Sequence, residues 1–452
     1  MKEMDLLEQL NQKNSQKVRV GVFDIDGILR GKIIHVSKLR KALAGGFGFC
    51  NVVFGWDSAD VPYGNSRVSG WHTGYPDAQA RLDPATLRFI PWEDGLPFVL
   101  GDFFTDMSGV GQVCPRTLLQ NISKQAEDLG YHPLFAGELE WFNFQETPQT
   151  WAAKKYRDPQ PLTPGMFGYS ILRASQQGDF FHALFDQLSA FEIPLEGLHT
   201  ETGDGVYEAC IIYDHILEAA DRMALFKTSV KEIAYQHDQL ASFMAKWNPD
   251  LPGCSGHIHQ SLWDRDGSQN LFYESTHPKG MSPLMEQYIA GQLYCLPYIL
   301  PMYAPTVNSY KRLVAGSWAA VSASWGIENR TAALRVVPGG PNSTRLETRV
   351  PGADANPYLT MAAALASGLY GIRHQLKLDT PPTKGNEYDH QGNPPLPRDL
   401  HSATQAMKSS PIAEELFGAD FVDHFVYTRE WEWQQFLKVV TDWEIQRYFE
   451  II

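Results

Sequence analysis

The sequence predicts an α+β protein with a small β-rich N-terminal domain and a larger mixed domain. Its 452 residues exceed what one ordinary hydrophobic core accommodates, so two domains are expected. Valines alternate near the start of the chain, whereas later segments carry apolar residues at the three- and four-residue spacings of helices. Gly109, Gly111 and Pro115 separate the two patterns. We therefore place the domains at residues 1–110 and 111–452.

The N-terminal domain opens on a predicted β-hairpin. Valine recurs at alternate positions from 18 to 22, Asp26 and Gly27 offer a tight turn, and residues 28–36 supply the returning strand. Ser37 is expected to cap a short helix that stops at a pair of glycines.

The larger domain is predicted to mix helices and strands. Apolar spacing indicates helices over residues 118–129, 223–240, 358–376 and 430–452. Strands are expected at residues 135–144, 256–262 and 334–337, and a long surface loop at 378–399.

Composition excludes several classes of partner. The formal charge of −14 disfavours nucleic acid and anionic membrane surfaces. No apolar run reaches the roughly 18–20 residues of a membrane helix, and the N-terminus lacks the apolar segment of a secretion signal. Five scattered cysteines without paired spacing suit a reducing compartment. We expect a cytoplasmic protein that binds neither nucleic acid nor membranes.

The commonest nucleotide-binding loops are missing from the sequence. It contains neither a GxxxxGK[ST] phosphate loop nor a GxGxxG turn between a strand and a helix. Any nucleotide chemistry must therefore depend on metal ions and arginines.

Two groups of glutamates are candidate metal ligands. Glu138 and Glu140 lie two apart in an apolar, aromatic segment, so on a strand both carboxylates face the same side. Two like charges on a buried strand are costly unless a cation neutralises them. Glu201 and Glu208 bracket a glycine-containing loop that suits a hard metal ion. An exposed edge strand and an ordinary acidic loop are the alternatives.

Histidines and a third acidic position extend this set. His257 and His259 also share one face of a predicted strand, although a hydrogen-bonded structural pair explains them as well. Glu347 lies between Arg345 and Arg349, where an ion-pair ladder on an exposed strand is the alternative.

Arginines gather in the same part of the sequence. One guanidinium group can bind two oxygens of a carboxylate or phosphate at once, and it stays charged at any working pH. Within residues 312–349 the chain carries Arg312, Arg330, Arg335, Arg345 and Arg349. This concentration in largely apolar segments favours an anionic substrate.

In order, these segments resemble the glutamine synthetase family over nearly the whole chain. The motifs that carry the resemblance are SGHIHQSL at 255–262, APTVNSYKRLVAG at 304–316, SWGIENRTAALRV at 324–336 and RLETRVPGADANPYL at 345–359. The resemblance implies the glutamine synthetase fold, with an N-terminal β-grasp domain and a catalytic domain whose curved antiparallel sheet is flanked by helices. It also implies a homo-oligomer, a dodecamer of two hexameric rings with sites between neighbouring chains.

The resemblance assigns roles to individual residues. One divalent ion, Mg²⁺ or Mn²⁺, would be held by Glu140, Glu201 and Glu208, and a second by Glu138, His257 and Glu347. Glutamate would be bound by Arg312 and Arg349, with Glu140 and Gly256 beside it. The phosphates of ATP would face Arg330, Arg335 and Arg345, of which Arg330 and Arg335 act on the transferred group. The nucleotide would lie against His259, Ser261, Tyr213 and Glu196. The implied reaction passes through an acyl phosphate at the glutamate side chain, which an amine then attacks.

The sequence departs from ammonia-using members of the family in three places. Their flap motif PGYEAP reads AGSWAA here, so Trp318 replaces the glutamate that helps bind and deprotonate ammonium. Their N-terminal DGSS motif is missing, and Asp57 or Asp60 in FGWDSAD stands near its position. The loop PGCSGHIH is shortened by one residue and lacks an asparagine.

The first two changes resemble those in γ-glutamylpolyamine and γ-glutamylputrescine synthetases. An indole cannot accept a proton, but it can stack on an alkyl chain or attract a cation. We therefore expect an organic amine, either a polyamine or a small alkyl or ethanol amine, as the preferred nucleophile. An ordinary ammonia-using glutamine synthetase is one alternative. A catalytically silent structural or regulatory oligomer, like the lens protein lengsin, is another.

Overall fold

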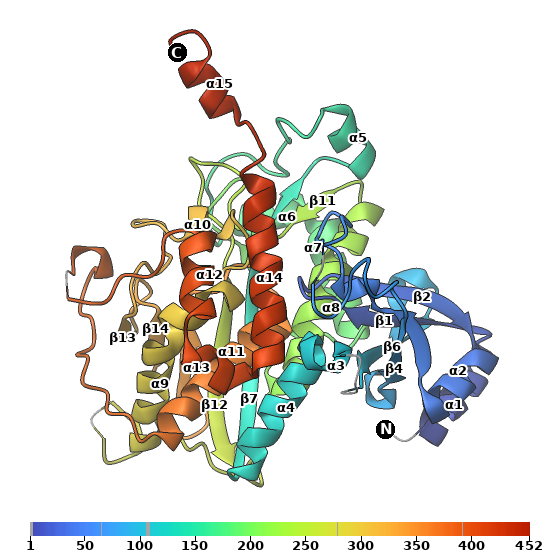
Figure 1. Ribbon diagram of the computed structural model, residues 1–452, viewed down its shortest axis with the longest axis horizontal. Coiled ribbons are helices and arrows are strands. Elements are labelled where there is room, and N and C mark those ends of the chain that lie inside the picture. Colours follow the sequence, from blue (N-terminus) through green and yellow to red (C-terminus); the bar gives the residue numbers. More distant parts are fainter. Residues whose placement is uncertain (1–2, 65, 105–108, 278, 391) are drawn as a thin grey trace.

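The computed structural model contains two sheets that draw on separate stretches of the chain (Figure 1). It describes residues 3–64, 66–104, 109–277, 279–390 and 392–452. Residues 105–108, just before the predicted domain boundary at 110/111, lie outside the described residues. None of the described helices is long and apolar enough to cross a membrane.

The first sheet has six strands in the order β2-β1-β6-β4-β3, with β5 paired to β6. Its strands β1 and β6 run parallel, and the other pairs are antiparallel. The elements of this part are α1 (Glu3–Gln12), β1 (Lys17–Phe23), β2 (Leu29–His35), α2 (Val36–Gly45), β3 (Phe47–Cys50), β4 (Asp77–Leu82), β5 (Arg88–Ile90) and β6 (Leu96–Phe103).

The predicted hairpin is confirmed, and the predicted helix cap is wrong. Strands β1 and β2 pair through the turn that contains Gly27, whose φ of 77° suits glycine. Helix α2 is capped by His35, whose ring accepts a hydrogen bond from the backbone N–H of Ser37. Ser37 therefore lies inside the helix, because an imidazole two positions earlier accepts the bond in its place.

The second sheet has nine strands in the order β13-β14-β15-β12-β7-β9-β8, and β10 and β11 pair with further parts of the long strand β7. All pairs are antiparallel except β13 with β14. The strands are β7 (Tyr131–Phe144), β8 (Leu195–Thr200), β9 (Val206–Ile211), β10 (Asp214–His215), β11 (Leu240–Ser242), β12 (Gly256–Asp264), β13 (Trp325–Ile327), β14 (Leu334–Val337) and β15 (Arg345–Thr348).

Helices flank this sheet, and α8 packs directly on β7 while α11 packs against α4, α8 and α9 (Figure 1). The helices are α3 (Val110–Val113), α4 (Pro115–Asp128), α5 (Pro148–Ala153), α6 (Ile171–Gln176), α7 (Gly178–Ala190), α8 (Ile216–Gln236), α9 (Pro283–Ile299), α10 (Ser309–Arg312), α11 (Pro357–Arg373), α12 (Leu400–Lys408), α13 (Pro411–Phe417), α14 (Ala419–Phe436) and α15 (Asp442–Tyr448).

The predicted helices and strands of this part are largely confirmed. Strand β14 has the predicted bounds, and β7, β12, α4, α8 and α11 overlap their predicted ranges. The helical stretch expected over residues 430–452 is confirmed in part, as two helices with a break between them. Helix α14 ends at Phe436, and a new helix, α15, starts behind the side-chain cap of Thr441 and projects away from the body (Figure 1).

A buried network of charged side chains joins the N-terminal part of the chain to the helices that flank the second sheet. The guanidinium of Arg116, at the start of α4, lies 2.8 Å from Asp83, 2.9 Å from Asp102 and 2.9 Å from Asp221. Asp83 and Asp102 belong to the N-terminal part, and Asp221 lies on α8. Burial opposes the charge of Arg116, but Asp221 and its other partners raise its pKa well above the usual value. One cation thus neutralises carboxylates from both parts of the chain.

Replacing Arg116 by Met should destabilise the protein strongly. The substitution leaves Asp102 and Asp221 buried without their cation, which costs about 3–5 kcal/mol in comparable pairs. Thermal or urea unfolding measures the loss. The control is Arg81→Met, because Arg81 also contacts Asp102, at 3.1 Å, but its side chain is 52% exposed. Its loss should stay within about 1 kcal/mol. Equal losses in both variants would contradict the account.

Candidate active site

The central strands of the second sheet carry the candidate ligands on one face. Residues two apart on a strand point the same way, and the strand register sets their neighbours. In β7, Glu138 lies opposite His257 of β12, and Glu140 lies opposite Glu208 of β9. Because β7 is flanked by β12 and β9, the alternative of an exposed edge strand is wrong.

The acidic loop expected between Glu201 and Glu208 turns tightly between β8 and β9. Gly205 has a φ of 73°, and a Cβ there would meet the carbonyl oxygen of Asn143 at 2.6 Å. Glycine is therefore required for the loop to pack on β7 and bring Glu201 over the sheet.

Among the described residues, three groups of ligand atoms converge on this face, each with its atoms within 4.8 Å of one another. The first group is Glu140, Glu201 and Glu208, the second is Glu138, His259 and Glu347, and the third is Glu138, Glu208 and Cys210. The first is the set that the sequence predicts.

The second group differs from the predicted set by one histidine. It contains His259 where His257 was expected, but His257 Nδ1 lies 3.0 Å from Glu138 and 3.4 Å from Glu347. His259 Nε2 lies 3.4 Å from Glu138. Both histidines thus point at the same carboxylates, and His257 as the metal ligand stays a prediction.

The pKa values of the clustered carboxylates are shifted in opposite directions. Burial raises the pKa of Glu208 to about 7, against a hydrogen bond from His199 and with the help of Glu138 and Glu140. Burial also raises the pKa of Glu140 above its usual value. Burial also favours the uncharged form of Glu138. Hydrogen bonds from His257 and His259 outweigh this effect and hold the pKa of Glu138 well below the usual range.

The donor set fits divalent cations. Mg²⁺ and Mn²⁺ prefer carboxylate oxygens, and Mn²⁺ also accepts imidazole. Among the described residues, the buried Nε2 of His257 has no hydrogen-bond partner. Raised pKa values at Glu140 and Glu208 mark a place where added positive charge is favourable.

The five predicted arginines surround this cluster. Arg312 and Arg349 are buried, and Arg349 contacts Glu347 and donates from Nε to the backbone oxygen of Arg330 at 3.0 Å. Arg335 lies 3.0 Å from Glu347, and Arg345 donates to His259 at 3.3 Å. Glu347 and Arg349 are buried, and Glu347 also pairs with Arg335, so the alternative of an exposed ion-pair ladder is wrong.

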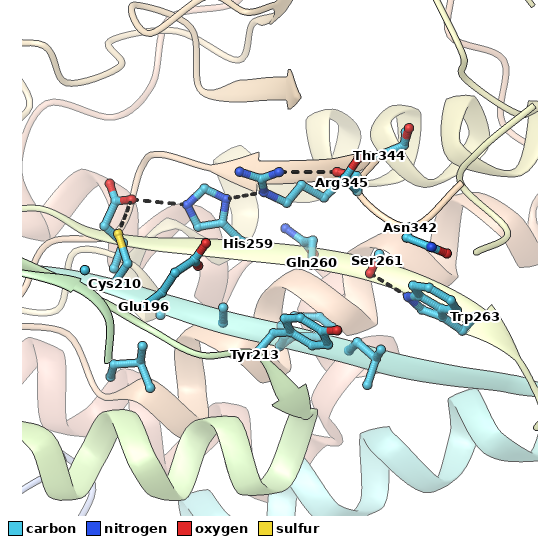
Figure 2. A pocket seen from close by; sticks show the side chains of 18 residues that line it. Glu196, Cys210, Tyr213, His259, Gln260, Ser261, Trp263, Asn342, Thr344 and Arg345 are labelled. Atoms are coloured by element: carbon cyan, nitrogen blue, oxygen red, sulfur yellow. Dashed lines mark hydrogen bonds and ion pairs between the residues drawn. The ribbon is translucent and has the colours of Figure 1, made fainter. Parts of the chain in front are cut away.

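A pocket of about 420 Å³ opens on the Glu138 and His259 side of the cluster. All five residues predicted to bind the nucleotide line it, namely Glu196, Tyr213, His259, Ser261 and Arg345. Figure 2 shows Cys210, Glu196 and His259 at one end, Trp263 and Asn342 at the other, and the ring of Tyr213 between them. Aromatic rings at one end and cationic or metal-binding groups at the other suit a nucleotide.

A larger pocket, of about 910 Å³, contains Trp318 and Arg330. The two pockets share no lining residue. Trp318 has a φ of 59°, a backbone conformation that bulky residues rarely adopt. Such conformations cost about 1–3 kcal/mol and are typical of functional sites.

Asp57 lies elsewhere in the chain. Its carboxylate accepts hydrogen bonds from the backbone N–H of Ala59 and Val61 and from Trp431 Nε1 at 2.9 Å. Asp60 pairs with Arg30 at 2.8 Å. Within one chain, both aspartates stabilise a turn of the N-terminal part, and a role for Asp57 in a neighbouring chain's site stays a prediction.

Sequence reasoning missed three side chains at the site. His199 Nε2 lies 3.1 Å from Glu208 and stacks on Tyr169 with ring centroids 4.4 Å apart. The thiol of Cys210 donates to Glu138 at 3.2 Å. His199 lies two residues from Glu201, and Cys210 lies two residues from Glu208. The rule that residues two apart on a strand share a face, which was used for Glu138 and Glu140, would therefore have found both.

Comparisons with known proteins agree with this architecture. Residues 112–448 match the family described as glutamine synthetase, catalytic domain. A solved structure titled GmaS/ADP complex superimposes with a TM-score of 0.85 at 25% identity, covering 99% of each chain. The glutamine synthetase fold expected from the sequence is thereby confirmed.

Similar proteins include both glutamine synthetases and glutamate–amine ligases. The chain is 47% identical to type-1 glutamine synthetase 2 of Dictyostelium discoideum over 450 residues, 99% of this chain and 86% of that one. It is 35% identical to glutamate–isopropylamine ligase of a Pseudomonas species over 455 residues, 100% and 98% of the two chains. It is also 35% identical to a γ-glutamylethanolamide synthetase of Streptomyces coelicolor over 429 residues, 94% and 91%. On these matches and this site, the chain belongs to the glutamine synthetase family and is a carbon–nitrogen ligase.

Proposed function

We propose that this ligase uses ATP to join glutamate, through its side-chain carboxylate, to an organic amine. The nucleotide would occupy the 420 Å³ pocket, with Tyr213 against its base and Arg345 and His259 beside its phosphates. Glutamate would lie by the buried Arg312 and Arg349, near Gly256 and Glu140. The planar forks of the two guanidinium groups match the oxygens of a carboxylate.

The chain's own residues account for the transfer step. Arg330 and Arg335 would hold the transferred phosphoryl group in line between ATP and the glutamate carboxylate, because their fixed forks match its oxygens. Arg335 is itself oriented by Glu347 and Glu328. Divalent ions bound at Glu138, Glu140, Glu201, Glu208, Glu347 and a histidine would screen the phosphate charge. The glutamyl phosphate formed in this way is the activated carboxyl that an unprotonated amine attacks.

The observation that carries the choice of an organic amine is Trp318. Its indole lines the 910 Å³ pocket at the position where ammonia-using relatives carry a glutamate. An indole offers no base and no counter-charge for a small ammonium ion, but it provides a surface for an alkyl chain. A polyamine or a small alkyl or ethanol amine is therefore the proposed nucleophile.

An amine panel tests this proposal directly. With ATP, Mg²⁺ and glutamate, phosphate release should be faster with alkylamines or ethanolamine than with ammonia at equal concentrations of the free base. Trp318→Glu should raise relative use of ammonia, by about tenfold, because a carboxylate can bind ammonium. The control Trp318→Phe keeps an aromatic surface and should keep the preference for organic amines.

An ordinary glutamine synthetase is the second candidate, favoured by the 47% identity to an enzyme of that name. In that case ammonia would exceed every organic amine in the panel, and the proposal above would be wrong. The double-hexamer assembly and a cytoplasmic location stay predictions. Light scattering of the purified protein measures the first.

A further inference from the structure

The 910 Å³ pocket adjoins the carboxylate cluster through residues other than those that line the nucleotide pocket. Its wall residue Glu328 and the cluster residue Glu347 are both paired with Arg335. The nucleotide pocket meets the cluster through Glu138 and His259 instead. Because the nucleotide occupies the other pocket in the proposed function, the larger pocket is left for a second substrate.

Part of the lining of this pocket is apolar. Trp318 and Trp325 line it together with Ile327 and Met281. Trp325 and Met281 are buried, so the packing around them fixes the shape of this surface. It suits the methylene chain of an amine rather than a lone ammonium ion.

The charged groups facing the pocket are mainly cationic. Arg330, Lys279 and Lys384 line it, and among the described residues none of the three forms an ion pair. Each of the two carboxylates that face it has a basic side chain nearby. Glu328 pairs with Arg335, and Glu286 lies 3.9 Å from His277. The pocket therefore attracts negative charge and opposes a second positive charge.

We propose that the amine substrate carries a carboxylate at the end remote from the reacting nitrogen, as an ω-amino acid does. Its chain would lie on Trp318 and Trp325, and its carboxylate would reach Lys279 and Lys384. The N–C bond to glutamate forms as the C–O bond to phosphate breaks. Phosphate leaves with that electron pair, and the nitrogen loses one proton to solvent. This inference rests on the proposed use of an organic amine and narrows it, because a polyamine would place its distal ammonium among these cations.

A series of amines matched in length tests the inference. γ-Aminobutyrate, aminobutanol, butylamine and putrescine share a four-carbon chain and differ in the charge at the far end. We expect kcat/KM to fall in that order, with γ-aminobutyrate ahead of putrescine by about tenfold or more. The ratio should shrink toward one as salt is raised, since exposed charges are screened.

Charge reversal at the two lysines provides the second arm. Lys279→Glu combined with Lys384→Glu should invert the order of γ-aminobutyrate and putrescine and leave the KM for glutamate unchanged. The control Lys41→Glu, on the exposed surface of α2, should preserve the wild-type order. If the double variant does not fold, the salt dependence of the wild-type ratio decides alone.

Three results would overturn the inference. One is a wild-type ratio near or below one at low salt, and another is an order that the double variant leaves unchanged. The third is a raised KM for glutamate alone in the double variant, which would mean that the lysines serve the acid substrate. Absence of phosphate release with every amine, ammonia excepted, would instead refute the proposed function itself.

Discussion

Glu140→Gln should reduce turnover about a thousandfold or more while leaving the protein folded and assembled. Glu140 belongs to the converging group with Glu201 and Glu208. A neutral amide at this position should weaken the binding of a divalent ion, which stabilises the transition state of phosphoryl transfer by several kcal/mol. The backbone N–H of Ser255, 2.7 Å from the carboxylate, can still donate to the amide oxygen. Phosphate release with the best amine measures the loss.

The same variant should not lower the thermal stability of the metal-free protein. Burial and the neighbouring carboxylates raise the pKa of Glu140, so removing its charge relieves a repulsion. The increase in melting temperature that Mg²⁺ gives the wild type should shrink in the variant. The control Glu192→Gln, at an exposed position outside the cluster, should retain both turnover and the response to Mg²⁺. Wild-type protein with intact assembly but no turnover with any amine would favour the silent structural oligomer.

Arg335→Lys should lower kcat about a hundredfold with a smaller change in KM. The guanidinium of Arg335 lies 3.0 Å from Glu347, also contacts Glu328, and is the cation that bridges the cluster and the larger pocket. Lysine keeps the charge but loses the rigid fork that matches phosphate oxygens in the transition state. Steady-state kinetics with saturating ATP separate kcat from KM.

The control for this substitution is Arg373→Lys, at the exposed end of α11. Its kinetics should match those of the wild type. A large rise in the KM for ATP with an unchanged kcat in Arg335→Lys would place the residue in ground-state binding and contradict its proposed role in the transferred group's stabilisation.

Local sequence rules predicted much of the site. The spacing of Glu138 and Glu140 placed both carboxylates on one strand face because strand periodicity is a property of the backbone. Strand β14 matched its predicted bounds because its apolar run is short and flanked by clear turn residues. The placement of Tyr213, Glu196 and Arg345 around one pocket depended on the family resemblance, since these residues lie on different segments.

Other features depend on contacts between distant segments, and sequence periodicity does not report these. Lys279, Glu328 and Lys384 meet in one pocket although more than a hundred positions separate the first from the last. Arg116 joins aspartates from three segments, and no local pattern marks it. The cap of α2 and the break after α14 were also missed. His35 and Thr441 accept hydrogen bonds from backbone N–H groups that other arrangements of the chain could also satisfy, and packing decides between these arrangements.

Anomalous diffraction from crystals grown with Mn²⁺ and a non-hydrolysable ATP analogue tests the central claim most directly. The account predicts one manganese peak among Glu140, Glu201 and Glu208, and a second beside Glu138 and Glu347, with the nucleotide in the 420 Å³ pocket. Manganese bound only outside this cluster, with the nucleotide elsewhere, would contradict it.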